Sequence, residues 1–119
     1  MAVRAIAFDR SGSSLITAGE DLHIFVSDVK TQQRLNVYVG HSDSISCICP
    51  HPTNKDLFLT TSLDNTIKVW STQSQNALNS LNLGSPVWGA AYSPKGDYFA
   101  AVTENGTISL INCKELQTM

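Results

Sequence analysis

A repeat of 42 residues constrains the fold of this chain more than any other feature of its sequence. The segments VRAIAFDRSG, ISCICPHPTN and VWGAAYSPKG begin at Val3, Ile45 and Val87, so the two spacings are both 42 residues. Small residues recur in the same register in all three segments, and a glycine or asparagine turn follows each. A period of about 20 to 50 residues indicates a repeat architecture, in which each copy forms one supersecondary unit.

A second pattern recurs downstream of each segment. LITAGEDLHIFVSD, FLTTSLDNTIKVWS and AAVTENGTISLIN each place a short apolar run before a turn and an alternating run after it. The turn positions are Asp21, Asp64 and Asn105. Asn105 followed by Gly106 predicts a type I′ hairpin, in which both central residues have positive φ. A third run (RLNVYV, ALNSLN and ELQTM) completes each unit.

Each unit therefore predicts four short strands. Val, Ile, Thr and aromatic residues alternate with period two, and no segment shows a helical period over about 10 residues. The predicted strands cover residues 3–8, 14–19, 22–27 and 34–39, then 44–49, 57–61, 66–70 and 77–82, then 86–92, 98–103, 107–112 and 115–119. Four strands in about 40 residues are typical of a propeller blade. We expect an all-β chain of three four-stranded antiparallel blades, over residues 1–40, 41–83 and 84–119.

The middle unit resembles the WD-repeat family of β-propellers. Gly40-His41 precedes its first strand and TIKVW ends at Trp70, where the family has a Gly-His pair and a Trp-Asp pair. Ser71 stands here in place of the family's Asp. The order VRAIAF, ITAGED, GH, KVW, VWGAAY and INC is similar, within the family, to the last three repeats of the WD-repeat subunits of superkiller complexes. That narrower resemblance implies a place in RNA decay or transcription.

The family resemblance implies a structural hydrogen-bond network of His41, Thr60, Asp64 and Trp70. In this network the Asp64 carboxylate orients the His41 ring, whose other nitrogen meets the Thr60 hydroxyl. That hydroxyl in turn meets the indole N–H of Trp70. A catalytic His–Asp pair is the weaker interpretation, because it needs a nucleophile and His41 would already be engaged.

The outer units depart from this pattern. Unit one has Ser27 where the tryptophan would stand, and unit three has Ser85, Asn105 and Ile111 at the His, Asp and Trp positions. We expect these two blades to depend on apolar packing instead of the network.

Three blades are too few to close a ring, since propellers have about 4 to 8. An open arc would expose the apolar faces of its two outer blades, and patches of that size do not stay bare on a soluble monomer. We expect either a fragment of a larger propeller or two copies that complete six blades. A start at a strand, without a preceding Gly-His loop, favours the fragment.

The leading functional hypothesis is a non-catalytic scaffold that binds other proteins or peptides and helps to assemble a multi-protein complex. In the family that the chain resembles, the second residue of each innermost strand points to the mouth of the central channel, where peptides dock. Those residues here are Arg4, Ser46 and Trp88. An exposed Trp beside an Arg is typical of interface hot spots. Packing of Trp88 against a neighbouring blade is the alternative.

Composition and charge argue against other classes of function. The net charge is −2 and the eight Lys and Arg residues are scattered, which does not favour nucleic acid. An enzyme is the second hypothesis and a nucleic-acid-binding module the third, but no acidic cluster faces the predicted channel. His23, His41 and His51 lie on different predicted elements, which does not suit zinc. We expect no cofactor, metal or membrane span, and a cytoplasmic or nuclear protein with reduced cysteines.

Overall fold

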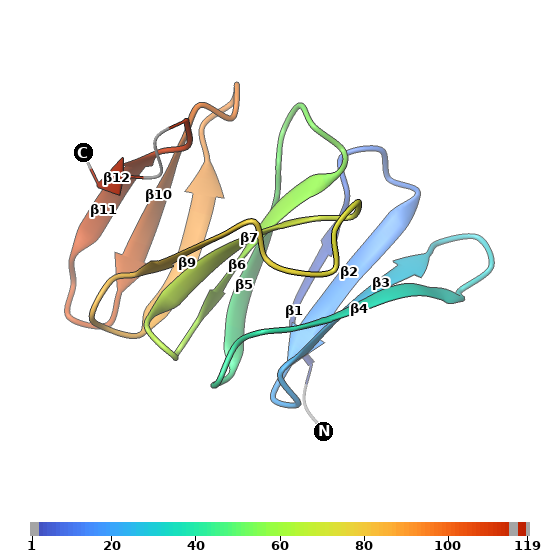
Figure 1. The fold of residues 1–119 in the computed structure, drawn as a ribbon, viewed down its shortest axis with the longest axis horizontal. Helices are drawn as coiled ribbons and strands as arrows, with labels where there is room; N and C mark the ends of the chain where they lie inside the picture. The colour runs from blue at the N-terminus through green and yellow to red at the C-terminus, as the bar shows by residue number, and fades with distance from the viewer. Residues whose placement is uncertain (1–2, 115–116, 119) are drawn as a thin grey trace.

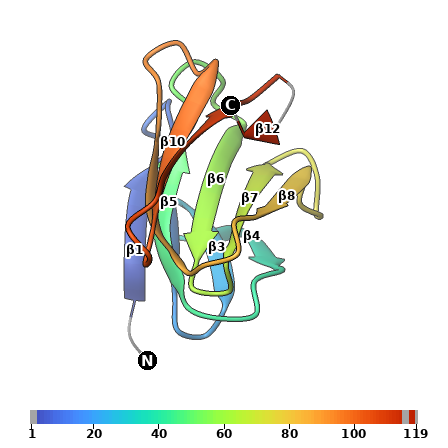
Figure 2. The same ribbon diagram turned by 90° about the vertical axis from the view of Figure 1, so that its left-hand side faces the viewer.

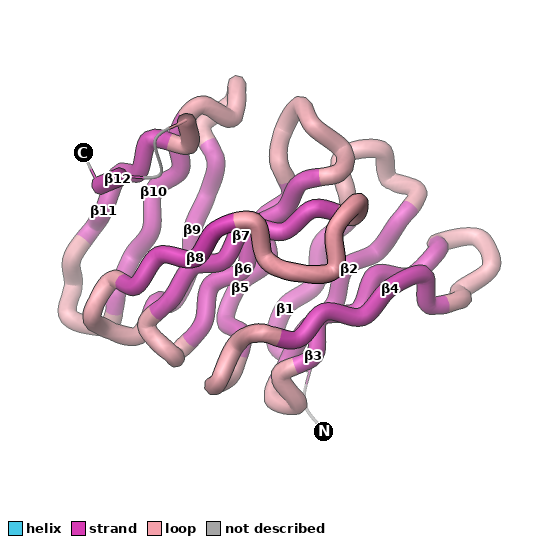
Figure 3. Tube along the Cα trace, viewed as in Figure 1, coloured by secondary structure: helices cyan, strands magenta, loops and turns pink. Residues whose placement is uncertain are grey.

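The computed structural model describes residues 3–114 and 117–118 of the chain. Its regular elements are β-strands, and the described residues contain no helix (Figure 3). Accordingly, no described segment is a helix of the length and apolarity needed to cross a membrane. The strands form three four-stranded antiparallel sheets, each of which we call a blade. The predicted all-β class and the three four-stranded blades are confirmed.

Each blade is a meander of four strands in chain order. Blade one contains β1 (Val3–Phe8), β2 (Ser14–Gly19), β3 (His23–Asp28) and β4 (Arg34–Val39). Blade two contains β5 (Ile45–Pro50), β6 (Leu57–Ser62), β7 (Thr66–Ser71) and β8 (Asn79–Asn82). Blade three contains β9 (Val87–Tyr92), β10 (Tyr98–Thr103), β11 (Ile108–Asn112) and β12 (Gln117–Thr118). Residues 115, 116 and 119 of the last predicted strand lie outside the described residues.

The three blades lie side by side in chain order, with their first strands adjacent (Figure 1). Strand β1 packs beside β5, and β5 packs beside β9. Figure 2 shows β1 and β5 on one side of the molecule and β4 and β8 toward the other. The first strand of each blade is therefore the inner one, and the fourth strand is the outer edge.

The core consists of two layers, one between each pair of neighbouring blades. Alternation along β6 divides its side chains between these layers, because successive residues of a strand point to opposite faces. Phe58 packs with Ile16, Ile24 and Tyr38 of blade one. The next residue, Leu59, packs with blade three. Blade two is thus buried on both faces.

The outer blades each leave one face uncovered. Ile6 and Phe8 alternate with residues of β1 that pack on blade two, and both are more than half exposed. On the uncovered face of blade three, Val102, Ile108 and Leu110 are exposed. These uncovered apolar faces are the ones that an added blade would cover in a larger ring.

The turn between the second and third strands has the same shape in all three blades. A residue with positive φ stands at corresponding positions, namely Leu22, Asn65 and Gly106. Asn105 does not have positive φ, so the predicted type I′ turn at Asn105-Gly106 is wrong. Instead the Gly106 N–H donates to the Thr103 carbonyl at 3.0 Å, which closes a turn before a left-handed glycine. This is the geometry of a three-residue hairpin loop with a bulge, and the backbone twist of the flanking strands accommodates it.

Candidate functional site

A relay of hydrogen bonds crosses blade two from the loop before β5 to the third strand. The His41 Nδ1 atom lies 2.9 Å from Asp64 Oδ2, and Nε2 lies 2.6 Å from the Thr60 hydroxyl. The Trp70 indole N–H donates to the same hydroxyl at 2.9 Å. Because an ionised carboxylate can only accept, Nδ1–H donates to Asp64. In the neutral ring Nε2 then accepts, so the Thr60 hydroxyl donates to Nε2 while it accepts from Trp70. Each hydrogen bond of the relay is therefore donated in the direction that leads from Trp70 to Asp64.

Asp64 is the end of the relay and accepts more hydrogen bonds than the sequence indicated. The backbone N–H groups of Ser42 and Thr66 donate to it at 3.0 and 2.9 Å, and the Thr66 hydroxyl donates as well. Burial by itself raises the pKa of Asp64, but hydrogen bonds from Thr66, Ser42 and His41 outweigh it and lower the pKa to about 2. Asp64 is therefore a carboxylate at neutral pH.

His41 carries no charge at neutral pH. Burial lowers its pKa below the ordinary value of 6.5, although the neighbouring Asp64 carboxylate opposes the shift. Both ring nitrogens are engaged in the relay, and the side chain is buried. Neither nitrogen is therefore available to a substrate, and the arrangement suits a structural role.

Trp70 is packed between blades and does not border an open pocket. It is 1% exposed, and its ring lies 5.2 Å from the ring of Tyr38 in blade one. The chain also passes close to it at Gly40, where an added Cβ would stand 2.9 Å from Cη2 of the indole. Only a glycine leaves room for this approach. Gly40 thus leaves room for the Trp70 ring, and His41 helps to orient it through Thr60.

Blade three carries no equivalent relay at the corresponding positions. Ala101 replaces the threonine and Ile111 replaces the tryptophan, and both are buried. They pack with Val87 and Phe99 against blade two. As expected from the sequence, this blade depends on apolar packing at these positions.

Three β-bulges mark the inner strands at one corresponding position. The pairing register shifts between Val3 and Ala5 in β1, and between Ile45 and Cys47 in β5. In β9, Val87 and Gly89 pair with adjacent residues of β10, which leaves Trp88 as the extra residue. The bulged residues are Arg4, Ser46 and Trp88, the three candidate partner-binding residues. A bulge releases its extra residue from the ladder and re-aims its side chain.

These three residues line one pocket of about 330 Å³, together with Ser44, Ile45 and Leu63. The structure therefore brings together residues that are 42 positions apart in the chain. Trp88 is 51% exposed, in contrast to the buried Trp70. About half of the Trp88 side chain is therefore open to solvent, and Trp88 stays a candidate partner-binding residue.

The side chains of the three bulged residues differ in the hydrogen bonds and ion pairs that they already form within the chain. The Arg4 guanidinium forms an ion pair with Glu20, and both side chains are largely exposed. The Ser46 hydroxyl donates to the Val87 carbonyl at 2.6 Å and lies 2.7 Å from the Thr61 hydroxyl. Since Ser46 has one proton, Thr61 is the donor in the second bond. Ser46 therefore joins blades two and three and has no proton left for a ligand.

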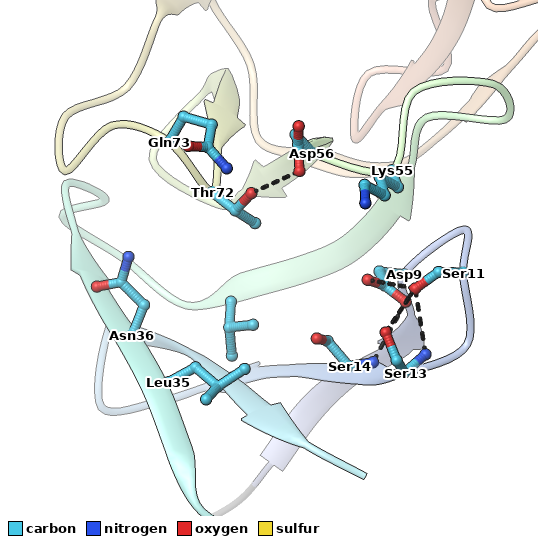
Figure 4. Close-up of a pocket in the computed structure, with 11 residues that line it drawn as sticks. Asp9, Ser11, Ser13, Ser14, Leu35, Asn36, Lys55, Asp56, Thr72 and Gln73 are labelled. Atoms are coloured by element: carbon cyan, nitrogen blue, oxygen red, sulfur yellow. Dashed lines mark hydrogen bonds between the residues drawn. The ribbon is translucent and has the colours of Figure 1, made fainter.

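A second pocket, of about 360 Å³, lies between blades one and two (Figure 4). It was not predicted from the sequence, because its walls come from strands and loops of two different units. Its charged lining residues are Asp9, Lys55 and Asp56. The Thr72 hydroxyl donates to Asp56 at 3.0 Å, and the Ser11 hydroxyl donates to Asp9 at 2.9 Å. Charges of both signs and internal hydrogen bonds favour no particular class of ligand here.

The part of the chain that the structure describes contains no group of three or more His, Cys, Asp and Glu residues that could hold a metal ion. His41 and Asp64 contact each other. His23 stacks on Phe25 within blade one, and His51, in the loop after β5, contacts Tyr92 of blade three.

Comparison with known proteins shows repeats of one family in this chain. The family model described as "WD domain, G-beta repeat" matches residues 32–71 and 77–112, which are more than half of the chain. The Set1 complex component swd2 of Schizosaccharomyces pombe is 39% identical over 110 residues, or 90% of this chain and 30% of that protein. Eukaryotic translation initiation factor 3 subunit I of Pyricularia oryzae is 30% identical over 118 residues, or 95% of this chain and 34% of that protein.

A solved structure shares the fold over almost the entire chain. The crystal structure of the Myceliophteria thermophila Cps50 (Swd1) beta-propeller domain superimposes with a TM-score of 0.88 at 20% identity, covering 98% of this chain and 36% of that one. The chain thus spans about a third of the length of the proteins it matches. The names of these relatives do not include the superkiller complex, so the link to RNA decay stays a prediction.

Proposed function

Because the chain belongs to the WD domain, G-beta repeat family, we propose that it is part of a propeller scaffold that holds subunits of a multi-protein complex together. Two relatives are, by name, a component of the Set1 complex and a subunit of a translation initiation factor. The uncovered faces of blades one and three are then covered by further blades of a larger propeller. We place the protein in the cytoplasm or the nucleus, in keeping with those relatives.

The proposed partner site is the pocket lined by Arg4, Ser46 and Trp88. One observation carries this proposal: three bulges at one repeat position aim these side chains at a single pocket, and the largest of them is half exposed. Tryptophan and arginine are enriched among residues that dominate binding energy. The proposal includes no catalytic step and no cofactor, and it assigns His41, Thr60, Asp64 and Trp70 to stability.

Substitution of Trp88 tests the proposal. We expect Trp88→Ala, made in the full-length protein, to remove at least one subunit from the complex recovered by affinity purification. The melting temperature should change little, because the side chain is half exposed. Leu78→Ala on the outer side is the matched control, since Leu78 is similarly exposed at 48%.

Two outcomes would contradict the proposal. An unchanged set of subunits with Trp88→Ala would show that this pocket does not hold a partner. A large fall in melting temperature would instead place Trp88 among the residues that hold the blades together.

A further inference from the structure

We propose that the Trp88 pocket accepts an uncharged apolar side chain, such as leucine or phenylalanine, from an extended segment of a partner protein. This inference rests on the proposed function and specifies its ligand. It follows from the chemistry of the pocket lining, where the apolar surface is open and the polar groups are already engaged.

The size of the pocket suits a side chain and excludes a folded element. Its volume of about 330 Å³ is at the lower end of the range of about 300–1,000 Å³ that small-molecule pockets occupy. Leu63 and Trp88 supply its apolar surface, and the fully buried Ile45 lies behind them. An aliphatic or aromatic side chain placed there loses contact with water and gains dispersion contacts with the indole.

Internal hydrogen bonds use most of the polar groups in the lining. Ser46 donates to the Val87 carbonyl and accepts from Thr61. The Ser44 carbonyl accepts from the Leu63 N–H at 3.0 Å, and the Ser62 hydroxyl shares its one proton between the carbonyls of Ser44 and Asp43. Among the hydroxyls of this lining, within the described residues, the Ser44 hydroxyl alone has no hydrogen-bond partner. One neutral hydroxyl cannot offset the desolvation of a charged group.

The charges around the pocket disfavour a charged side chain of either sign. The lining contains no carboxylate, so a lysine or arginine side chain would be desolvated without a counter-ion. Arg4 is the lining's charged residue, and it already forms an ion pair with Glu20. An acidic side chain would have to compete with Glu20 for it. A guanidinium has five N–H groups, so Arg4 can still donate to a backbone carbonyl of an extended segment.

The indole N–H groups of Trp88 and Trp70, once their resonances are assigned, provide a direct test in the full-length protein. Capped peptides of sequence Ser-Gly-X-Gly-Ser, with Leu, Phe, Glu or Lys at X, are titrated while the indole N–H resonances are followed by NMR. We expect the Leu and Phe peptides to shift the Trp88 resonance and to bind at least about tenfold more tightly than the Glu and Lys peptides. The Trp70 resonance is the internal control, because its N–H is buried and bonded to Thr60.

The outcomes separate this inference from the proposed function. A Trp88 shift with the Glu or Lys peptide at equal or higher affinity would overturn the apolar assignment and leave the partner site in place. If no peptide shifts Trp88 and Trp88→Ala also retains every subunit, the proposed function fails as well. If no peptide shifts Trp88 but Trp88→Ala loses a subunit, the partner does not bind through one inserted side chain, and the inference alone fails.

A charge introduced into the wall should invert the preference. Ser44→Asp places a carboxylate in the lining, and we expect it to favour the Lys peptide over the Leu peptide. Ser80→Asp adds the same charge on the exposed outer strand β8 and should leave the preference unchanged. An unaltered preference in Ser44→Asp would show that the lining does not contact the side chain at X.

Discussion

Blades two and three turn the same face toward the preceding blade, but they build it with different chemistry. In both blades a phenylalanine of the second strand pairs with a large residue of the third, Phe58 with Trp70 and Phe99 with Ile111. In blade two this pair is joined to the hydrogen-bond relay of His41 and Thr60, and in blade three it is not. The apolar pair is therefore sufficient to build a blade in this fold.

The difference indicates what the relay contributes. A buried polar network whose members are all bonded fixes the orientation of each side chain, whereas apolar packing fixes mainly volume. Blade two is buried on both faces, so an error in its orientation would affect both of its neighbours. The following predictions test whether the relay stabilises blade two beyond the packing that both blades share.

Trp70→Ala should have the largest effect. We expect the free energy of unfolding to fall by about 3–5 kcal/mol, because a fully buried aromatic leaves a cavity. Ile111→Ala is the matched change in blade three, with an expected loss of about 2–5 kcal/mol. Chemical denaturation followed by circular dichroism measures both. A smaller loss for Trp70→Ala than for Ile111→Ala would show that the relay adds nothing to packing.

Thr60→Val removes the central hydroxyl of the relay with little change of shape. The Trp70 N–H and the His41 Nε2 then lose their partner, and we expect a loss of about 2–3 kcal/mol by the same denaturation measurement. Thr61→Val on the opposite face is the control, since its hydroxyl serves only Ser46 among the described residues. We expect it to lose about 1 kcal/mol. Equal losses in the two variants would contradict a cooperative relay.

Acidification should weaken blade two through His41. Its pKa in the folded state is below 6.5, so in the interval beneath that value the unfolded chain binds more protons, and stability falls as pH falls. The slope is at most about 1.4 kcal/mol per pH unit for one proton. Urea unfolding of the wild type and His41→Asn from about pH 7.5 to about pH 5 isolates this contribution. Parallel pH profiles would contradict it.

Asp64 should add a second loss at lower pH. Its pKa falls from 3.8 to about 2 on folding, so its contribution is present above 3.8 and is lost as pH falls toward 2. Blade three has Asn105 at this position, which does not titrate. The expected acid sensitivity therefore belongs to blade two alone of these two blades.

Substitutions in the turn after the second strand should have the smallest effects on stability, and the effects in blades two and three should be equal. Asn65 and Gly106 both have positive φ, at 78° and 85°. We expect Asn65→Ala and Gly106→Ala each to lose about 0.5–1 kcal/mol, since alanine disfavours this conformation. A Cβ at Gly106 would meet nothing within 4 Å, so the loss there is conformational. Unequal thermal shifts would show that the two blades differ in their turns as well as in the relay.

The sequence predicted the strands because repetition and alternation act locally. Each run of alternating residues gave the position of a strand to within about two residues, although β8 begins at Asn79 instead of residue 77. The relay residues came from the family resemblance at Gly40-His41 and Trp70. Local pattern alone would not bring His41 and Trp70 together, because they lie on different elements.

Three features could not be predicted from the sequence and became clear only in the three-dimensional structure. The turn at Asn105 depends on the pairing register of β10 with β11, which the dipeptide Asn-Gly does not encode. Thr66 and Ser42 donate to Asp64 through short polar groups that have no distinctive spacing in the sequence. The bulges also leave no sign in the alternation, because an extra residue alters the pairing with the neighbouring strand and not the composition of its own.

The bulge at the start of each inner strand has a consequence for how such a protein diversifies. The bulged residue is outside the pairing ladder, and the three blades hold a cation, a small hydroxyl and a large aromatic ring at that one position. The frame of the blade is the same in each case. In the proposed partner site, a substitution at Arg4, Ser46 or Trp88 would therefore change what the pocket binds, one residue per blade, while the pairing of the strands stays the same.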